Sequence, residues 1–171
     1  MDPVTVSILI SAPRERVFDY LQDIANHPQF TDHYQVDWHL TRIDPVGLGA
    51  GARFRIKAPA NRFSWGDAAF TEVERPHRIV EAGRMGKNNR IRTLGVYDLA
   101  PAADGGTRVR FTFESVPAKL SDRLMEGLGG RRWLRRKNQR AMHRLRSILE
   151  HAEGAGAAPE GVGRRITVAG G

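Results

Sequence analysis

The strongest constraint on the fold of this chain is an abrupt change of hydrophobic period near its start. Apolar side chains alternate along residues 4–10, as in a β-strand with one buried face. After Pro13, the apolar residues of 14–23 recur at helical spacing instead. The sequence therefore predicts a strand that leads directly into an amphipathic helix, followed by a second short segment that ends near Tyr34.

The order of the remaining patterns indicates the fold class. Several β-like runs with Gly and Pro turns follow, and one long Arg-rich helical pattern covers about residues 118–153. A helix pair near the start, a run of strands and a terminal helix are typical of an antiparallel sheet with helices on one face. We therefore predict an α+β fold.

Seven short motifs follow one another along the chain and can be compared with known families. They are Ile10-Ser11-Ala12-Pro13, Val17-Phe18-Asp19-Tyr20-Leu21 with Asp23, Asn26-His27-Pro28-Gln29-Phe30, residues 45–54, Tyr97-Asp98-Leu99-Ala100-Pro101, Gly105-Gly106-Thr107-Arg108-Val109 and residues 145–150. Together they resemble the START-like, helix-grip superfamily (SRPBCC, the polyketide cyclase/dehydrase and lipid-transport group) over about residues 4–152. The resemblance implies a curved antiparallel sheet of about six or seven strands wrapped round a long C-terminal helix. It also implies two short helices after the first strand, and a cavity that often holds an apolar small molecule.

Length and composition are those of one domain. A chain of 171 residues can bury about two-thirds of its unfolded surface. We expect a ligand-binding domain over residues 1–153 and a flexible Gly- and Ala-rich tail over 154–171, in which 164–168 could add a strand to an edge of the sheet or to a neighbouring molecule. No apolar run of membrane-spanning length and no signal peptide is visible, so a cytoplasmic protein is expected. The absence of Cys excludes disulfides and Cys-based zinc sites.

The positive charge is concentrated in the terminal helix. Of the 27 Lys and Arg residues, ten fall within 118–152 against only three acidic residues, so nearly all of the net charge of +8 belongs there. Two interpretations stay open: a solvated helix face, which is the more common case, or a patch for anionic lipid headgroups. The residues proposed for an anionic membrane surface are Arg131, Arg132, Arg135, Arg136 and Arg140.

The same helix carries an apolar stripe and an interrupted start. Leucine, isoleucine and alanine side chains recur at steps of three, four and seven, which predicts a face that closes over the sheet. Gly127, Gly129 and Gly130 disfavour helix, each by about 1 kcal/mol relative to Ala. We therefore expect the main helix to begin near Arg131 and residues 120–128 to form a separate helix or flap. The stripe consists of Leu134, Ala141, Leu145, Ile148, Leu149 and Ala152.

Alternation in the strands predicts the cavity wall. Residues 52–58 and 108–114 each show one apolar and one polar face, and the apolar faces should meet the helix. Residues 62–74 are less regular, and a bulge near Gly66 would reconcile their two parities. A filled core accounts for the same aromatic residues equally well. The predicted ligand-binding residues are Phe54, Phe63, Trp65, Asp67, Tyr97, Phe111 and Phe113.

Three residues are weak candidates for acid–base chemistry. If the parity of Phe63 holds, Trp65 and Asp67 face the interior beside Phe54, where burial would raise the proton affinity of the Asp67 carboxylate. The alternative is that a bulge turns Asp67 outward, or that Arg84 or Arg92 pairs with it. Glu81 lies on a strand whose inward face is ambiguous, and Tyr97 carries a hydroxyl that needs a partner when buried.

Histidine and glycine patterns exclude other sites. The six histidines form no metal-binding motif, so no metal is predicted, and His27 is expected to be structural. His33 and Tyr34 could border a pocket mouth or lie in a surface turn. The glycine run 47–51 leads into a strand rather than a helix, which argues against a phosphate loop. No cofactor is predicted.

Three function classes follow. The favoured one is a binding or carrier protein for an apolar or aromatic small molecule such as a lipid, a polyketide-like ring or an isoprenoid. The second is a cyclase, aromatase or dehydratase that uses an acid or base in the same cavity. The third is an accessory protein that docks on an anionic lipid surface or a partner through its Arg-rich helix. No sequence-reading nucleic-acid module is present, so nucleic acid ranks below lipid, and nothing indicates the oligomeric state.

Overall fold

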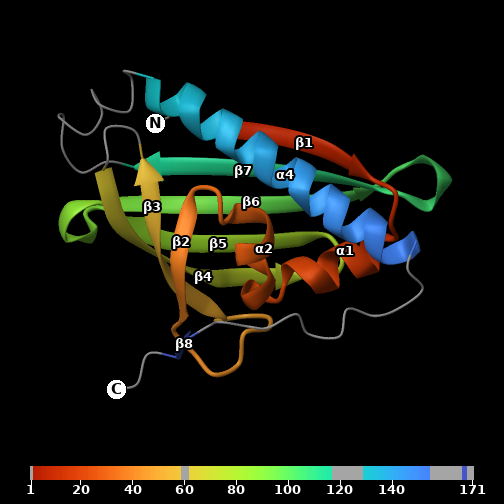
Figure 1. The fold of residues 1–171 in the computed structure, drawn as a ribbon. Coiled ribbons are helices and arrows are strands. Elements are labelled where there is room, and N and C mark those ends of the chain that lie inside the picture. Colours follow the sequence, from red (N-terminus) through yellow and green to blue (C-terminus); the bar gives the residue numbers. More distant parts are fainter. Residues whose placement is uncertain (1, 59–61, 117–128, 155–166, 169–171) are drawn as a thin grey trace.

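The computed structural model describes residues 2–58, 62–116, 129–154 and 167–168. The elements follow the predicted order, with two short helices between the first two strands and a long helix after the seventh strand (Figure 1). They are β1 (Val4–Ile10), α1 (Arg14–Leu21), a 3-10 turn (Ile24–Asn26), α2 (His27–Thr31), β2 (Gln35–Leu40), β3 (Gly51–Ala58), β4 (Arg62–Glu74), β5 (Arg78–Met85), β6 (Ile91–Pro101), β7 (Thr107–Val116), α4 (Arg131–Gly154) and β8 (Thr167–Val168).

The predicted change of period at the start of the chain is confirmed. Alternate residues of β1 are buried, and α1 begins directly after Pro13, whose carbonyl oxygen accepts the Val17 N–H at 3.1 Å. One face of α1 is fully buried, with Val17 and Phe18 both at 0 % exposure. This junction therefore fixes where α1 and α2 pack on the sheet.

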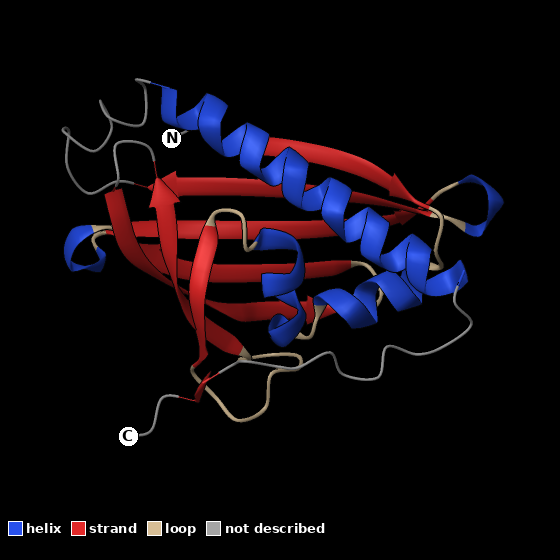
Figure 2. Cartoon of the chain, in the orientation of Figure 1, coloured by secondary structure: helices blue, strands red, loops and turns tan. Residues whose placement is uncertain are grey.

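A single sheet with strand order β1-β7-β6-β5-β4-β3-β2-β8 forms the body of the molecule. Neighbouring strands from β1 to β2 are antiparallel, whereas β8 pairs in parallel with β2 at His39 and Leu40. The sheet curves, and the described α-helices α1, α2 and α4 lie on its inner side (Figure 2). The α+β helix-grip prediction is therefore confirmed. Most of the tail that precedes and follows β8 lies outside the described residues.

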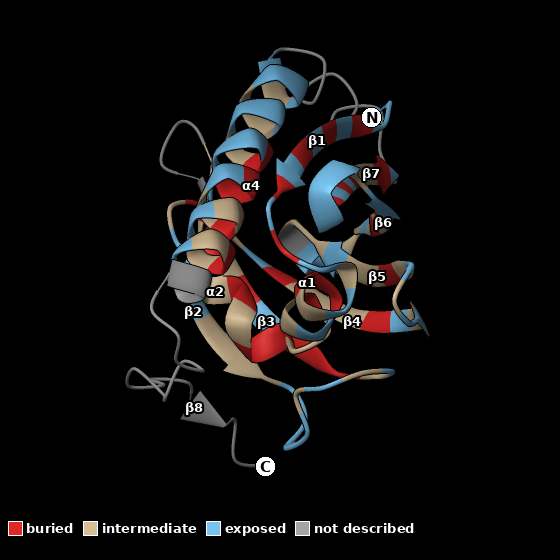
Figure 3. Ribbon diagram, turned by 90° about the vertical axis from the view of Figure 1, so that its right-hand side faces the viewer, coloured by how far each residue is buried: buried red, intermediate tan, exposed pale blue. Residues whose placement is uncertain are grey.

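Helix α4 crosses the sheet with its apolar stripe turned inward (Figure 3). Its buried residues include Ala141, Leu145 and Leu149, and it packs on β1 and α2. The helix begins at Arg131, just after Gly129, whose φ of 103° is readily adopted only by glycine. The predicted start is therefore confirmed, whereas the predicted flap at 120–128 lies outside the described residues.

The irregular strand β4 contains its bulge at a different place from the predicted one. Its pairing with β5 shifts register between Phe70 and Glu72, not near Gly66. The even-numbered residues before the shift therefore face inward: Phe70 is 1 % exposed, and a Cβ at Gly66 would lie 3.2 Å from the Phe54 ring. The predicted inward parity of Trp65 is wrong, and this residue is 37 % exposed.

Among the described residues, no helix combines the length and apolar character that crossing a membrane requires.

Candidate functional site

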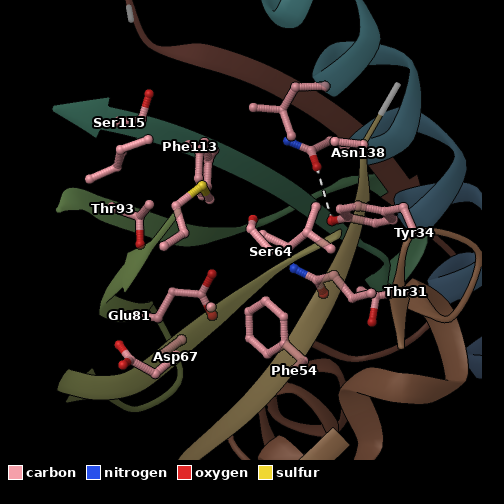
Figure 4. Close-up of a pocket in the computed structure, with 18 of the residues that line it drawn as sticks. Thr31, Tyr34, Phe54, Ser64, Asp67, Glu81, Thr93, Phe113, Ser115 and Asn138 are labelled. Carbon is pink, nitrogen blue, oxygen red and sulfur yellow. Dashed lines mark hydrogen bonds between the residues drawn. The ribbon is translucent and has the colours of Figure 1, made fainter. Parts of the chain in front are cut away.

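A pocket of about 500 Å³ lies between the inner face of the sheet and the first turns of α4. Its wall is mostly apolar, and Figure 4 shows the few polar side chains that reach into it. Strands β2 to β7 form the floor, α2 closes one side and α4 covers the top. Apolar side chains of the wall include Trp38, Phe54, Ile56, Met85, Ile91, Tyr97, Phe111, Phe113, Trp133 and Leu134.

Most of the predicted wall residues border this pocket. Phe54 and Phe113 contribute ring surface, and Tyr97 stacks on Phe111 with ring centroids 4.4 Å apart. Trp38, which sequence reasoning missed, packs on Phe54 at 4.6 Å. The half-buried, irregular pattern of β2 gives no alternation that would have identified it. For Phe63, the side chain is not among those that the structure describes.

Trp65 lies on the opposite face of the sheet from the pocket. Its ring packs against the Arg53 guanidinium at 4.9 Å and the His39 ring at 6.0 Å. In the pairing of β3 with β4, Trp65 lies opposite Arg55, whose neighbour Phe54 faces inward. Trp65 therefore packs with the charged outer face of β3 and contributes nothing to the pocket wall.

Asp67 lies at the rim of the pocket rather than within it. Its Oδ1 accepts the backbone N–H of Arg84 at 2.9 Å, and it also borders a second hollow on the outer face. In Figure 4 the Asp67 carboxylate points away from Phe54. The partner is the Arg84 backbone rather than a guanidinium, and of the two alternatives for Asp67 this geometry fits the outward one.

Glu81 is the carboxylate that faces the pocket. It lies opposite Gly95 in the pairing of β5 with β6, and a Cβ at Gly95 would approach the Glu81 Oε1 to 2.3 Å. The carboxylate therefore lies over Gly95, where only glycine leaves room for it. No described residue donates a hydrogen bond to it or forms an ion pair with it, and the part of its surface that stays accessible borders the pocket.

The surroundings of Glu81 change several proton affinities. Burial raises the pKa of Glu81 from its ordinary value of 4.5 to about 7. Burial also raises the pKa of both Tyr34 and Tyr97, and the Glu81 charge raises each of them further. Two phenol groups that stay protonated thus lie close enough to Glu81 to sense its charge, and Glu81 itself can gain or lose a proton near neutral pH.

A second polar group enters the pocket from α4. Asn138 is 1 % exposed, and its Oδ1 accepts the Tyr34 hydroxyl proton at 3.1 Å. Its Nδ2 is buried and has no hydrogen-bond partner among the described residues. Sequence reasoning missed Asn138, although it lies four residues after Leu134 and three before Ala141, on the apolar stripe. A single amide side chain among the apolar residues of the stripe is the sequence signal that could have identified Asn138 as a pocket residue.

The two residues that end the predicted helical segment differ in their roles. Tyr34 is buried and borders the pocket. His33 does not line it: its Nε2 lies 3.1 Å from the Lys137 carbonyl oxygen, and its Nδ1 lies 3.4 Å from the Arg144 guanidinium. Burial and the neighbouring cations lower the pKa of His33, so it ties α2 to α4 in the neutral form.

His27 is a buried residue of the pocket wall. Its Nε2–H donates to the Leu21 carbonyl oxygen at 2.9 Å, and its ring packs on Phe30 and Phe70. Burial lowers the pKa of His27 to about 4, so the ring is neutral at neutral pH. This arrangement supports the expected structural role. Within the described ranges, no three His, Asp or Glu side chains are grouped as metal ligands would be.

The Arg-rich face of α4 lies on the outside, beside the pocket. All five arginines proposed for an anionic surface are exposed, and only Arg131 has an acidic neighbour in the described residues, Asp2 at 3.6 Å. Gly130, Trp133 and Leu134, which border the pocket, belong to the same stretch of chain.

Solved structures share this fold at low sequence identity. KanY (ms6282), determined by NMR, superposes with a TM-score of 0.69 at 17 % identity, covering 86 % of this chain and 97 % of that one. CV1439 from Chromobacterium violaceum gives 0.60 at 14 % identity, with 88 % and 99 % covered. DynU16, from the dynemicin biosynthetic locus, gives 0.61 at 18 %, covering 89 % of this chain but only 48 % of DynU16. Identities this low show the fold alone.

The family comparison is more specific than these structures. No curated protein matches the chain by sequence. The model of the family described as polyketide cyclase/dehydrase and lipid transport matches residues 1–150, which include the whole sheet from β1 to β7 and nearly all of α4. The chain therefore belongs to the polyketide cyclase/dehydrase and lipid-transport family.

Proposed function

We propose that this protein binds an apolar or aromatic small molecule, such as a lipid, a polyketide-like ring or an isoprenoid, and acts as its carrier. The observation that carries the proposal is the pocket of about 500 Å³ beneath α4. Its size and its mostly apolar wall are typical of small-molecule sites, in which a few polar groups orient the ligand. Family membership supports the same class of ligand.

The wall provides stacking surface for a flat ligand. Trp38 and Phe54 pack together on one part of it, and Tyr97 and Phe111 on another. Aromatic side chains offer large apolar area with little conformational freedom to lose, which favours rigid ring systems. A ligand in this space would contact residues of the sheet and of α4 together.

A variant that fills the pocket tests the carrier function. Ala68 lies on the inward face of β4 and borders the pocket, so Ala68→Phe places a ring in the empty space. We expect this variant to lose at least tenfold in affinity for the neutral probe N-phenyl-1-naphthylamine, since the added ring occupies the volume of the ligand. Fluorescence titration measures the affinity, and native mass spectrometry of protein from its own host shows whether an apolar compound co-purifies.

Trp65→Ala is the matched control for that experiment. Because Trp65 lies on the outer face with Arg53, its removal is expected to change probe affinity by less than twofold. Equal binding by wild type and Ala68→Phe, or a strong loss in Trp65→Ala, would contradict a ligand site beneath α4. Thermal denaturation of both variants separates loss of binding from loss of folding.

A second candidate is an acid–base enzyme of the cyclase, aromatase or dehydratase type. The observation in its favour is Glu81, which has no described partner and a pKa raised to about 7, as suits a proton donor or acceptor at neutral pH. Tyr97 would supply a nearby hydroxyl, whereas the position of Asp67 at the rim makes it a poorer candidate. Turnover of a bound compound by wild type but not by Glu81→Gln would favour this class.

The exposed Arg face of α4 supports a proposed secondary role in docking. Residues 131–140 carry five arginines beside the helical turns that border the pocket, so an anionic lipid surface would bring the pocket close to a source of ligand. Binding to vesicles containing phosphatidylserine that weakens as salt is raised would support this role. Equal binding to neutral vesicles would exclude it.

A further inference from the structure

The Asn138 side chain is arranged for a partner that the described part of the protein does not supply. The residue is 1 % exposed, it borders the pocket, and its Nδ2 donor has no hydrogen-bond partner there. Buried polar groups in folded proteins nearly always have one, because leaving a donor unpaired destabilises the fold. An unpaired donor at a pocket wall therefore indicates a ligand atom that accepts its hydrogen bond.

Tyr34 determines which end of the amide is available. Its hydroxyl donates to Oδ1 at 3.1 Å, and the ring is itself buried, so the amide oxygen already has its partner. The amide nitrogen is what remains. Since Tyr34 follows α2 and Asn138 lies on α4, this hydrogen bond also joins the two helices that enclose the pocket.

The Asn138 Nδ2 donor determines which kind of ligand oxygen can lie against it. A carbonyl oxygen accepts hydrogen bonds and has no proton of its own to satisfy. A hydroxyl oxygen can accept the same bond, but it brings a proton that needs an acceptor of its own. On the floor of the pocket, Glu81 offers a carboxyl group that could pair with a hydroxyl elsewhere on the ligand (Figure 4).

We propose that Asn138 recognises a carbonyl oxygen, so that the pocket selects apolar ring compounds bearing a keto or acyl group over the corresponding hydrocarbons. This inference rests on the proposed binding function and adds the substrate class. Tyr34 is a positioning residue in it, because it acts only through the Asn138 amide.

The test compares a ketone with its hydrocarbon in two proteins. Fluorenone and fluorene share one rigid tricyclic frame and differ in a single carbonyl group, and each displaces N-phenyl-1-naphthylamine in a competition titration. We expect the ratio of the fluorene Kd to the fluorenone Kd to fall about tenfold on Asn138→Leu, the usual loss for one neutral hydrogen bond. Fluorene and fluorenone differ in hydration free energy, but this difference is the same in both ratios. It therefore cancels when the ratio for Asn138→Leu is compared with the ratio for wild type.

The matched control is Gln139→Leu, which makes the same kind of change one residue away on the exposed side of α4. It should leave the ratio unaltered. Asn138→Leu removes an unpaired donor but also leaves the buried Tyr34 hydroxyl without its acceptor, so the double variant Tyr34→Phe/Asn138→Leu is the one expected to unfold at an equal or higher temperature than wild type. If the preference for fluorenone is lost while the unfolding temperature is kept, Asn138 contributes to ligand selection and is not a purely structural residue.

The outcomes separate this inference from the function on which it rests. If both compounds bind and Asn138→Leu leaves the ratio unchanged, the carbonyl site is overturned while the apolar pocket stands. If neither compound nor the reporter binds to wild type, the proposed binding function is overturned and the carbonyl site with it.

Discussion

Replacing Leu145 by alanine is expected to destabilise the fold by about 3–5 kcal/mol, whereas the same replacement at Leu134 should cost about 1 kcal/mol. Leu145 is 0 % exposed in the core that α4 shares with the sheet. Leu134 lies about three turns earlier on the same stripe but borders the pocket, so part of its surface already touches empty space. The cost of a Leu→Ala change depends on how many neighbouring atoms lose contact, and far more do so at Leu145.

The measurement is urea unfolding of the two variants under identical conditions, with Ser147→Ala on the exposed side of α4 as the control. A loss of about 3–5 kcal/mol is a large share of the usual stability of a small domain, so Leu145→Ala should be partly unfolded at about 37 °C. Equal losses at Leu134 and Leu145 would mean that the space beside Leu134 is filled, contrary to the pocket.

Much of the fold could be predicted because local pattern and tertiary packing agree along most of the chain. The switch from alternation to helical period at Pro13 placed β1 and α1, and the stripe containing Ala141 and Leu145 identified the buried face of α4. These signals are strong because each residue of the pattern faces one environment throughout its element.

The orientation of β4 could not be predicted, because the bulge that sets it depends on the pairing of β4 with β5. Trp65 and Phe70 are aromatic and have opposite parity, so hydrophobicity alone allows either to face inward. The register shift after Phe70 determines which one does, and it is set by the partner strand rather than by the sequence of β4. The parity assumed from Phe63 is what placed both Trp65 and Asp67 on the inner face.

Glu81 and Asn138, the polar residues of the candidate site, could not be placed in the pocket from the sequence for related reasons. In β5, Ile79 and Val80 are both buried, so alternation does not show which face meets the pocket. Glu81 faces inward because Gly95 on the next strand leaves room over its backbone, a relation between residues far apart in the sequence. Asn138 was missed because an amide beside several arginines resembles one more solvated position.

Glu81→Gln is expected to stabilise the protein by about 1–3 kcal/mol at pH 8 and to leave its stability unchanged at pH 4. Ionised Glu81 is costly in the folded state, because burial raises its pKa from 4.5 to about 7. A pKa difference of one between the folded and unfolded states corresponds to about 1.4 kcal/mol, so the full penalty is about 3 kcal/mol once the pH exceeds the folded pKa. The lower part of the range allows for partial hydration of a carboxylate that borders the pocket.

The pH dependence of the two proteins distinguishes this account from a general effect of removing a charge. As pH rises from 4.5 to about 7, the unfolded chain releases the Glu81 proton first, so this group lowers stability across that window and adds no slope above it.

His27 acts in the opposite sense. Its folded pKa of about 4 lies below the ordinary 6.5, so its contribution to stability is complete above pH 6.5 and is lost as pH falls to about 4. The two contributions nearly cancel in the wild type. Glu81→Gln should therefore expose the His27 slope, so that between about pH 6.5 and 4 its free energy of unfolding falls by about 1–3 kcal/mol more than that of the wild type. Urea unfolding at about pH 8, 6.5, 5 and 4 measures both curves, and parallel curves would show that Glu81 is ionised in the pocket without cost.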